Sequence, residues 1–215
     1  LFNMKIKKPL FWDNKNFTLL KYVLQPISFI YFLLSKINLK KKEKVKDIFS
    51  ICVGNIYIGG TGKTPACILI KKILEDLNVK ACFVKKYYND QIEEQYLLKK
   101  HGELFSEKNR KHSLIKSKNN GFKVAILDDG LQDKTLDYNL KIVCFNSEVF
   151  IGNGNLIPSG PLRSKLSSIK HFDAVLLNGL IYNNAENINC IKKIKPNISI
   201  FETTYKLKNL ESIDK

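Results

Sequence analysis

Acidic residues are scarce in this sequence. Its 215 residues include 36 Lys and Arg but 20 Asp and Glu, which gives a formal net charge of +16. This excess predicts an anionic partner, which is nucleic acid, an acidic membrane face or a phosphorylated substrate. A composition that merely reflects a coding bias toward Lys and Asn would produce the same balance. The net charge alone therefore does not show whether the protein has an anionic partner.

Cysteine pairs with metal-site or redox spacing are absent. The five cysteines are odd in number and include no C-x-x-C pair, which leaves no readable disulfide framework or zinc site. Most of them lie in apolar runs, as the reduced and buried thiols of a cytosolic protein do. The three histidines, His101, His112 and His171, have neither metal-ligand nor catalytic-triad spacing, and we expect them at the surface or in loops.

An uninterrupted apolar run of roughly 20 residues, which a membrane-spanning helix requires, is also missing. Residues 17–39 come nearest, but Lys21, Gln25 and Pro26 interrupt them, and no signal-peptide cleavage site follows. We expect two short helices, hinged near Pro26, that lie in or against a membrane interface, with the lysines of residues 36–46 facing anionic headgroups. The alternatives are a helix folded onto the domain core and a single span whose lysine-rich end is cytoplasmic.

Apolar residues are plentiful enough for one sizeable α/β domain and an appendage, since they make up 44% of the chain. Short apolar runs alternate with helical stretches, which is typical of a parallel sheet covered by helices on both faces. The strand-like runs are residues 48–53, 79–84, 122–127, 141–145 and 173–178, followed by a partly alternating run at 198–205 that is typical of an edge strand.

A glycine-rich loop follows the first strand-like run and precedes a helical stretch. It consists of Gly59, Gly60, Thr61, Gly62, Lys63 and Thr64. The backbone N–H groups of such a loop and the positive end of the helix dipole favour a nucleotide phosphate. Lys63 would add a charge on the terminal phosphates, and the Thr64 hydroxyl would ligate Mg²⁺. Tyr57 stands where the strict Gly-x-x-x-x-Gly-Lys-Thr pattern has its first Gly, so a plain glycine-rich turn is the alternative interpretation.

With this loop, the chain divides into three expected parts. Residues 1–46 are expected to form the membrane-associating helices, and residues 47–180 a P-loop nucleotide-binding α/β domain. Residues 181–215 are expected to be a linker or the start of a C-terminal lobe. Met4 is the single methionine, so residues 1–3 are expected to precede the true start.

Two acids, Asp128 and Asp129, follow the strand-like run at 122–127. In a P-loop NTPase, an acid at the carboxyl end of a strand in the same sheet holds Mg²⁺, directly or through water. Asp128 and Asp129 are therefore predicted to share a metal site with Thr64. An Asp-Asp-Gly sequence is also an ordinary turn, which is the alternative.

Two further segments can contribute to catalysis. Residues 153–163 form a Gly- and Pro-rich loop that ends on Arg163, whose planar guanidinium suits phosphate. An ordinary surface loop with a solvated Arg fits this stretch equally well. Glu93 and Glu94 lie on a helix-like segment. Paired acids at this place could orient or deprotonate a substrate hydroxyl, and the alternative is an ordinary solvated helix start rich in Glu.

Together, these motifs resemble those of the tetraacyldisaccharide 4′-kinases, the lipid A 4′-kinase family. The resemblance covers roughly residues 10–205. It is carried by residues 53–65, by Asp128-Asp129-Gly130-Leu131-Gln132 and by residues 152–163, in the order and spacing of the family. The family likewise lacks Gly at the position of Tyr57, and its members carry an N-terminal membrane-associating helix.

The resemblance implies transfer of the γ-phosphate of ATP to the 4′-hydroxyl of a tetraacylated disaccharide 1-phosphate in lipid A biosynthesis. It implies ATP and Mg²⁺ as cofactors, with Lys63 on the phosphates. Thr64, Asp128 and Asp129 would hold the metal, and Arg163 would bind the acceptor's phosphate or the transferring group. The implied location is the cytoplasmic face of the inner membrane. The expected partners are the anionic lipid and the membrane surface, not nucleic acid, and an oligomeric partner stays open.

Three departures from the family pattern bear on catalysis. Asp133 stands where the family has His after its Asp-Asp-Gly-x-Gln motif. The family's Gly-Asp-Glu segment, which carries its proposed base, aligns best with Ile92-Glu93-Glu94, so Glu93 is the predicted catalytic base. Members normally carry a further C-terminal lobe that closes over the nucleotide, so we expect a fragment or an unusually short member.

Two other functions stay open. A P-loop NTPase or kinase with another acceptor would share the glycine-rich loop, although a GTPase is disfavoured because Asn178-Gly179-Leu180 does not match the Asn-Lys-x-Asp guanine motif. A membrane-bound nucleotide-binding module with degenerate catalysis would account for Asp133.

Overall fold

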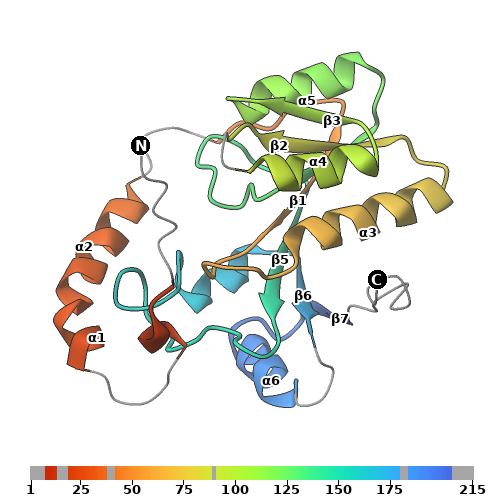
Figure 1. The fold of residues 1–215 in the computed structure, drawn as a ribbon. Coiled ribbons are helices and arrows are strands. Elements are labelled where there is room, and N and C mark those ends of the chain that lie inside the picture. Colours follow the sequence, from red (N-terminus) through yellow and green to blue (C-terminus); the bar gives the residue numbers. More distant parts are fainter. Residues whose placement is uncertain (1–7, 14–18, 38–41, 89–90, 180–183, 205–215) are drawn as a thin grey trace, which may run out of the picture.

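One seven-stranded parallel sheet organises the chain (Figure 1). The computed structural model describes residues 8–13, 19–37, 42–88, 91–179 and 184–204, so part of the predicted N-terminal region, of its basic run and of the C-terminal tail lies outside the described residues. The strand order is β3-β2-β4-β1-β5-β6-β7. The strands are β1 (Phe49–Gly54), β2 (Ala81–Lys86), β3 (Leu104–Glu107), β4 (Val124–Asp128), β5 (Leu140–Asn146), β6 (Ala174–Asn178) and β7 (Ser199–Thr203).

Helices cover both faces of the sheet, which confirms the predicted α/β class. The helices α3 (Lys63–Asp76) and α4 (Ile92–Lys100) pack on one face, and α5 (Arg110–Asn119), the 3-10 helix η2 (Leu166–His171) and α6 (Ala185–Ile194) on the other. Strand side chains alternate between the faces. Within β1, Val53 therefore enters the core under α3, and Cys52 enters the core under α5.

The predicted strands fall close to β1, β2, β4, β5 and β6, and the expected edge strand is β7, which pairs only with β6 among the described strands. Two elements were not predicted. The strand β3 has four residues, and α6 lies beyond residue 180, where we expected a linker or the start of a further lobe. Because β7 pairs in parallel with β6, the sheet itself continues past the boundary expected at residue 180.

The N-terminal segment forms two short helices, as expected. They are α1 (Leu19–Val23) and α2 (Gln25–Lys36), which follow the 3-10 helix η1 (Leu10–Trp12). Pro26 lies in the first turn of α2, where its missing N–H costs no helical hydrogen bond. Within the described ranges, no helix combines the length and the apolar character needed to cross a bilayer.

Helix α2 packs on the domain by one side and leaves the other exposed. Ser28 is its buried residue. The large apolar side chains that α1 and α2 expose are Leu19, Leu20, Tyr22, Val23, Ile27, Phe29, Ile30, Leu33 and Leu34. Both helices lie to one side of the sheet in Figure 1.

The cysteines and histidines lie largely where the sequence predicts. Cys52, Cys67, Cys82 and Cys144 are buried, and Cys190 is exposed. Burial raises the pKa of the Cys82 thiol to about 11 and that of Cys144 to about 12, so both thiols stay protonated and unreactive at neutral pH. All three histidines are exposed.

Candidate active site

The glycine-rich loop joins β1 to the N-terminus of α3 at the carboxyl edge of the sheet. Gly62, which caps α3, has φ 78°, and Gly59 has φ 139°. A side chain rarely adopts these angles, so the loop depends on glycine at both positions. The loop thereby presents the N–H groups at the start of α3 to the space in front of the sheet, where they favour phosphate.

Two asparagine side chains hold this loop, one directly after β1 and the other at the end of β6. The Nδ2 of Asn55 donates to the hydroxyl of Thr61 at 3.1 Å and to the carbonyl of Gly59 at 3.3 Å. The Nδ2 of Asn178, at the end of β6, donates to the carbonyl of Thr61 at 2.6 Å. Thr203, on β7, donates in turn to the side-chain oxygen of Asn178. Support for the loop therefore comes from β1, β6 and β7 together.

Asp128 is fully buried at the end of β4, where it faces the start of α3. The Thr64 hydroxyl donates to its Oδ2 at 3.0 Å, whereas its Oδ1 has no hydrogen-bond partner among the described residues. A hydroxyl and a carboxylate with a free oxygen fit Mg²⁺, which takes one or two carboxylates and fills its other positions with water and substrate phosphate. In the described part of the chain, no group of three or more His, Cys, Asp or Glu is arranged so that it could hold a metal ion.

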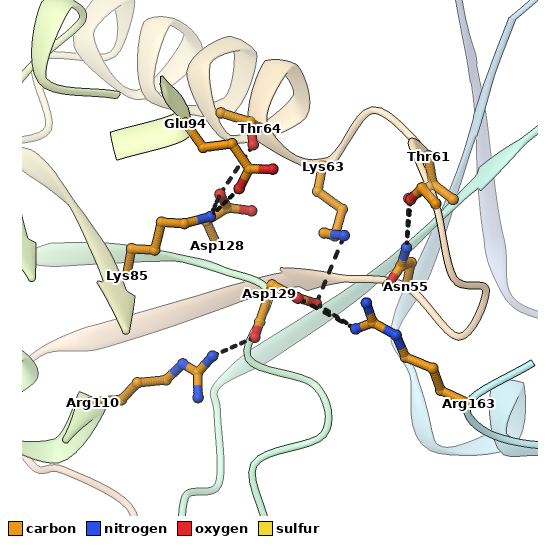
Figure 2. Close-up of polar contacts among 11 residues, drawn as sticks. Asn55, Thr61, Lys63, Thr64, Lys85, Glu94, Arg110, Asp128, Asp129 and Arg163 are labelled. Carbon is orange, nitrogen blue, oxygen red and sulfur yellow. Dashed lines mark hydrogen bonds and ion pairs between the residues drawn. The ribbon is translucent and has the colours of Figure 1, made fainter. Parts of the chain in front are cut away.

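A buried lysine completes the surroundings of Asp128 (Figure 2). Lys85, at the end of β2 and 1% exposed, places its Nζ 2.7 Å from Asp128 Oδ2 and pairs with Glu94 on α4. Burial works to lower the pKa of Lys85, but Asp128 and Glu94 outweigh it and raise the pKa. The ammonium therefore stays charged beside Asp128. Sequence reasoning did not single out Lys85, and its one signal was a lysine at the end of an apolar strand.

Asp129 lies between the two cations predicted to contact phosphate. Its carboxylate is 3.8 Å from Lys63 Nζ and 3.3 Å from Arg163 Nη1 (Figure 2). Its backbone has φ 59°, a left-handed conformation that Asp tolerates better than most residues. Two hydrogen bonds hold this conformation. The N–H of Asp129 donates to the carbonyl of Val53 at 2.8 Å, and Arg110 Nη2 donates to the carbonyl of Asp129 at 2.6 Å.

Asp133, at the position where the resembling family has His, anchors Arg110. Its Oδ2 accepts from Arg110 Nη1 at 3.3 Å, and its Oδ1 accepts from the N–H and hydroxyl of Thr135 at 2.9 and 2.6 Å. Burial works to raise the pKa of Asp133, but the Thr135 hydrogen bonds and the Arg110 charge lower it. Asp133 is therefore an ionised acceptor that fixes the arginine contacting Asp129.

A pocket of about 460 Å³ opens beside Asp129. Its charged lining consists of Lys86, Lys108, Arg110, Arg163, Asp129 and Asp133, and tyrosine, asparagine, glutamine and threonine side chains complete it. Four basic groups, two carboxylates and neutral hydrogen-bonding groups suit a phosphorylated, hydroxyl-rich molecule.

Of the six residues predicted to act in catalysis or metal binding, the structure brings five together, which are Lys63, Thr64, Asp128, Asp129 and Arg163. The sixth, Glu93, is exposed in the first turn of α4, and its side chain makes no ion pair or hydrogen bond with other described residues. Its neighbour Glu94 is the carboxylate that reaches Lys85.

Comparison with known proteins identifies relatives of this chain. A family model described as tetraacyldisaccharide-1-P 4′-kinase matches residues 20–214. A curated tetraacyldisaccharide 4′-kinase of Pelagibacter ubique is 49% identical over 99% of this chain and 68% of its own length. The Rickettsia canadensis protein of the same name is 33% identical over 74% of this chain and 54% of its own length. The chain therefore spans about half to two thirds of the length of these relatives.

Solved structures support the fold. LpxK from Aquifex aeolicus, solved in complex with ATP, matches 92% of this chain and 85% of its own with a TM-score of 0.62 and 18% identity. The signal recognition particle receptor FtsY from Elizabethkingia anophelis matches 88% of this chain and 67% of its own with a TM-score of 0.51 and 8% identity.

Proposed function

Because the chain belongs to the tetraacyldisaccharide-1-phosphate 4′-kinase family, we propose that it transfers the γ-phosphate of ATP to the 4′-hydroxyl of a tetraacylated disaccharide 1-phosphate. One observation carries the proposal. The acids at the end of β4 meet Lys63 and Thr64 at the start of α3, and Arg163 reaches the same carboxylate as Lys63. Phosphoryl transfer needs this set, which is cations on the phosphates and oxygen ligands for a metal beside them.

In the proposed reaction, the acceptor oxygen bonds to the γ-phosphorus, and the bond from that phosphorus to the bridging oxygen of ADP breaks. Lys63 and Arg163 leave Asp129 for the phosphates and offset the charge that develops on them. Glu93, which is free of ion pairs in the described structure, takes the proton of the acceptor hydroxyl. ADP and the 4′-phosphorylated lipid are the products.

We further propose that Mg²⁺ is held by Thr64 and Asp128, with Asp129 directly or through water. The Oδ1 of Asp128 supports this assignment, since a buried carboxylate oxygen needs a partner and this one has none among the described residues. When bound, the ion would supply positive charge that offsets the charge of the phosphates. Lys85 stays paired with Asp128 and holds that carboxylate in place.

The acceptor is proposed to place its phosphorylated sugars in the basic pocket beside Asp129, while its acyl chains stay in a membrane. The exposed apolar side chains of α1 and α2 and the net charge of +16 support contact with an anionic bilayer surface. We propose that this surface is the cytoplasmic face of the inner membrane, where ATP is present.

The test is an assay of the purified chain with ATP, Mg²⁺ and the lipid disaccharide 1-phosphate. We expect transfer to the 4′-hydroxyl, and we expect Lys63→Ala to lower kcat by about 10² to 10³-fold because a phosphate-binding cation is lost. Lys72→Ala, an exposed lysine on the same helix, is the matched control and should leave kcat unchanged. Unchanged activity in Lys63→Ala would contradict the mechanism.

The same assay separates the alternatives. Nucleotide binding without transfer, under conditions where the 49% identical relative is active, would indicate a binding module. Transfer to a different hydroxyl compound would indicate a kinase with another acceptor. Asp133 no longer argues for degenerate catalysis, because it anchors the arginine that holds Asp129.

A further inference from the structure

The phosphate loop and Arg163 share a short antiparallel ribbon. The Arg163 N–H donates to the carbonyl of Ile56 at 2.7 Å, and the Ile58 N–H donates to the carbonyl of Pro161 at 2.9 Å. Tyr57 and Leu162 form the bridge between these two bonds. Since Ile58 directly precedes Gly59, a shift of Arg163 along this ribbon would move the phosphate loop as well.

Helix α2 is hydrogen-bonded to the same ribbon and its loop. The Tyr31 hydroxyl donates to the carbonyl of Arg163 at 2.9 Å. The Ser28 hydroxyl donates to the carbonyl of Leu156 at 2.9 Å and accepts from the N–H of Ser159 at 3.0 Å. In Figure 1, α2 lies beside the segment that contains this loop. These bonds fall on the inner side of the helix, opposite its exposed apolar side chains.

Tyr57, the residue that departs from the strict phosphate-loop pattern, belongs to this contact. Its side chain is 2% exposed and packs with Leu156, Leu162 and the partly buried Tyr31 of α2. Its hydroxyl donates to Asp13 Oδ1 at 2.5 Å, just after η1. A glycine at position 57 would remove this apolar and polar link between the N-terminal segment and the loop.

From these contacts we infer that Ser28 and Tyr31 are positioning residues for the phosphate-transfer site. They hold Arg163 and, through the ribbon, the start of the phosphate loop. Helix α2 is thus a structural part of the active site in addition to being a surface that meets lipid. As far as it concerns catalysis, this inference rests on the proposed kinase function.

Two substitutions and a matched control test the inference. Tyr31→Phe removes the oxygen that contacts Arg163, and Ser28→Ala removes the hydroxyl that contacts Leu156 and Ser159. Ser35→Ala is the control, because the Ser35 hydroxyl bonds within α2, to the carbonyl of Phe32. None of the three changes the exposed apolar side chains, so all should bind anionic vesicles like the parent chain.

Hydrogen exchange measured by mass spectrometry is the readout that does not need turnover. In Tyr31→Phe and Ser28→Ala, the peptides that contain the amides of Ile58 and Arg163 should exchange roughly three- to tenfold faster, the effect of about one hydrogen bond, and in Ser35→Ala they should not. Exchange at the parent rate in Tyr31→Phe, whose fold is the least disturbed, would overturn the inference even if Ser28→Ala proved unstable.

Kinetics then tests the consequence for catalysis. With vesicle-borne acceptor, Tyr31→Phe should lower kcat by roughly three- to tenfold because Arg163 is misplaced, while vesicle binding stays at the parent level because the lipid surface is intact. Equal kcat with faster exchange would confine the link to structure and overturn the catalytic part. Absence of transfer in the parent chain would count against the proposed function, while the exchange result would still decide the structural link.

Discussion

At the scale of single residues, the two carboxylates that begin α4 have different surroundings. Glu94 is tied to Lys85, and Lys85 is tied to Asp128. Glu93 makes no such pair in the described structure and is exposed. The side chain of Glu94 is thus held by its ion pair, whereas that of Glu93 has no such constraint from the described residues. Glu93 therefore stays the proposed acceptor of the proton, and Glu94 is the carboxylate that places Lys85.

Substitution of each carboxylate by its amide tests this division. Glu93→Gln should lower kcat by about 10²-fold or more, the usual contribution of a general base, and leave the Mg²⁺ requirement unchanged. Glu94→Gln should instead raise the Mg²⁺ concentration needed for half-maximal rate, because Lys85 then competes more strongly for Asp128. Steady-state rates across a Mg²⁺ titration measure both effects. The reverse pattern would exchange the two roles.

At the scale of secondary-structure elements, the last two strands of the sheet support the phosphate loop. Asn178 at the end of β6 donates to the carbonyl of Thr61, and Thr203 on β7 orients that amide. The loop therefore depends on residues more than one hundred positions further along the chain. We expect the part of the chain after residue 180 to contribute to nucleotide binding through this contact.

Asn178→Ala tests the contribution of β6 and β7. Loss of one buried hydrogen bond should raise the Kd for Mg·ATP by roughly three- to tenfold. Asn187→Ala removes a similar amide-to-carbonyl bond, at 2.9 Å to Ser147, from α6, and it should leave that Kd unchanged. Titration with a fluorescent ATP analogue gives both values. An equal loss of affinity in the two variants would indicate general destabilisation and not support of the loop.

The elements differ in how far the sequence could predict them. The buried strands are continuous apolar runs, and the glycine-rich loop and the Asp128-Asp129 pair are local patterns, so each could be predicted without knowledge of the fold. Lys85 and Asn178 could not be assigned a role, because their function depends on which strand ends are neighbours. The strand β3 has four residues, too few for a clear pattern, and it pairs with β2. In the sequence, Tyr57 is a departure from the phosphate-loop pattern. Its role could not be predicted, because the residues that it contacts are distant from it in the sequence.

At the scale of the whole molecule, the exposed apolar helices and the proposed phosphate-transfer site are joined through one loop. The side of α2 that faces the domain binds the segment that ends on Arg163, and the opposite side exposes residues such as Ile30 and Leu34. A bilayer that receives α1 and α2 would therefore lie next to the site where we propose that the lipid's sugar binds. The net charge of +16 adds attraction to anionic lipids, which salt weakens.

Vesicle flotation tests this arrangement. The double variant Ile30→Glu with Leu34→Glu, at 56% and 60% exposed positions of α2, should lower binding to phosphatidylglycerol vesicles at least tenfold, because each buried apolar side chain contributes about 1.5 kcal/mol or more. Leu69→Glu with Ile73→Glu, at 45% and 50% exposed positions one turn apart on α3, changes the charge equally and should bind like the parent chain. High salt should weaken the parent's binding without abolishing it, since the apolar part is not screened. Equal losses in both double variants would show that net charge alone holds the protein to vesicles, and the helices would then lose their assigned role.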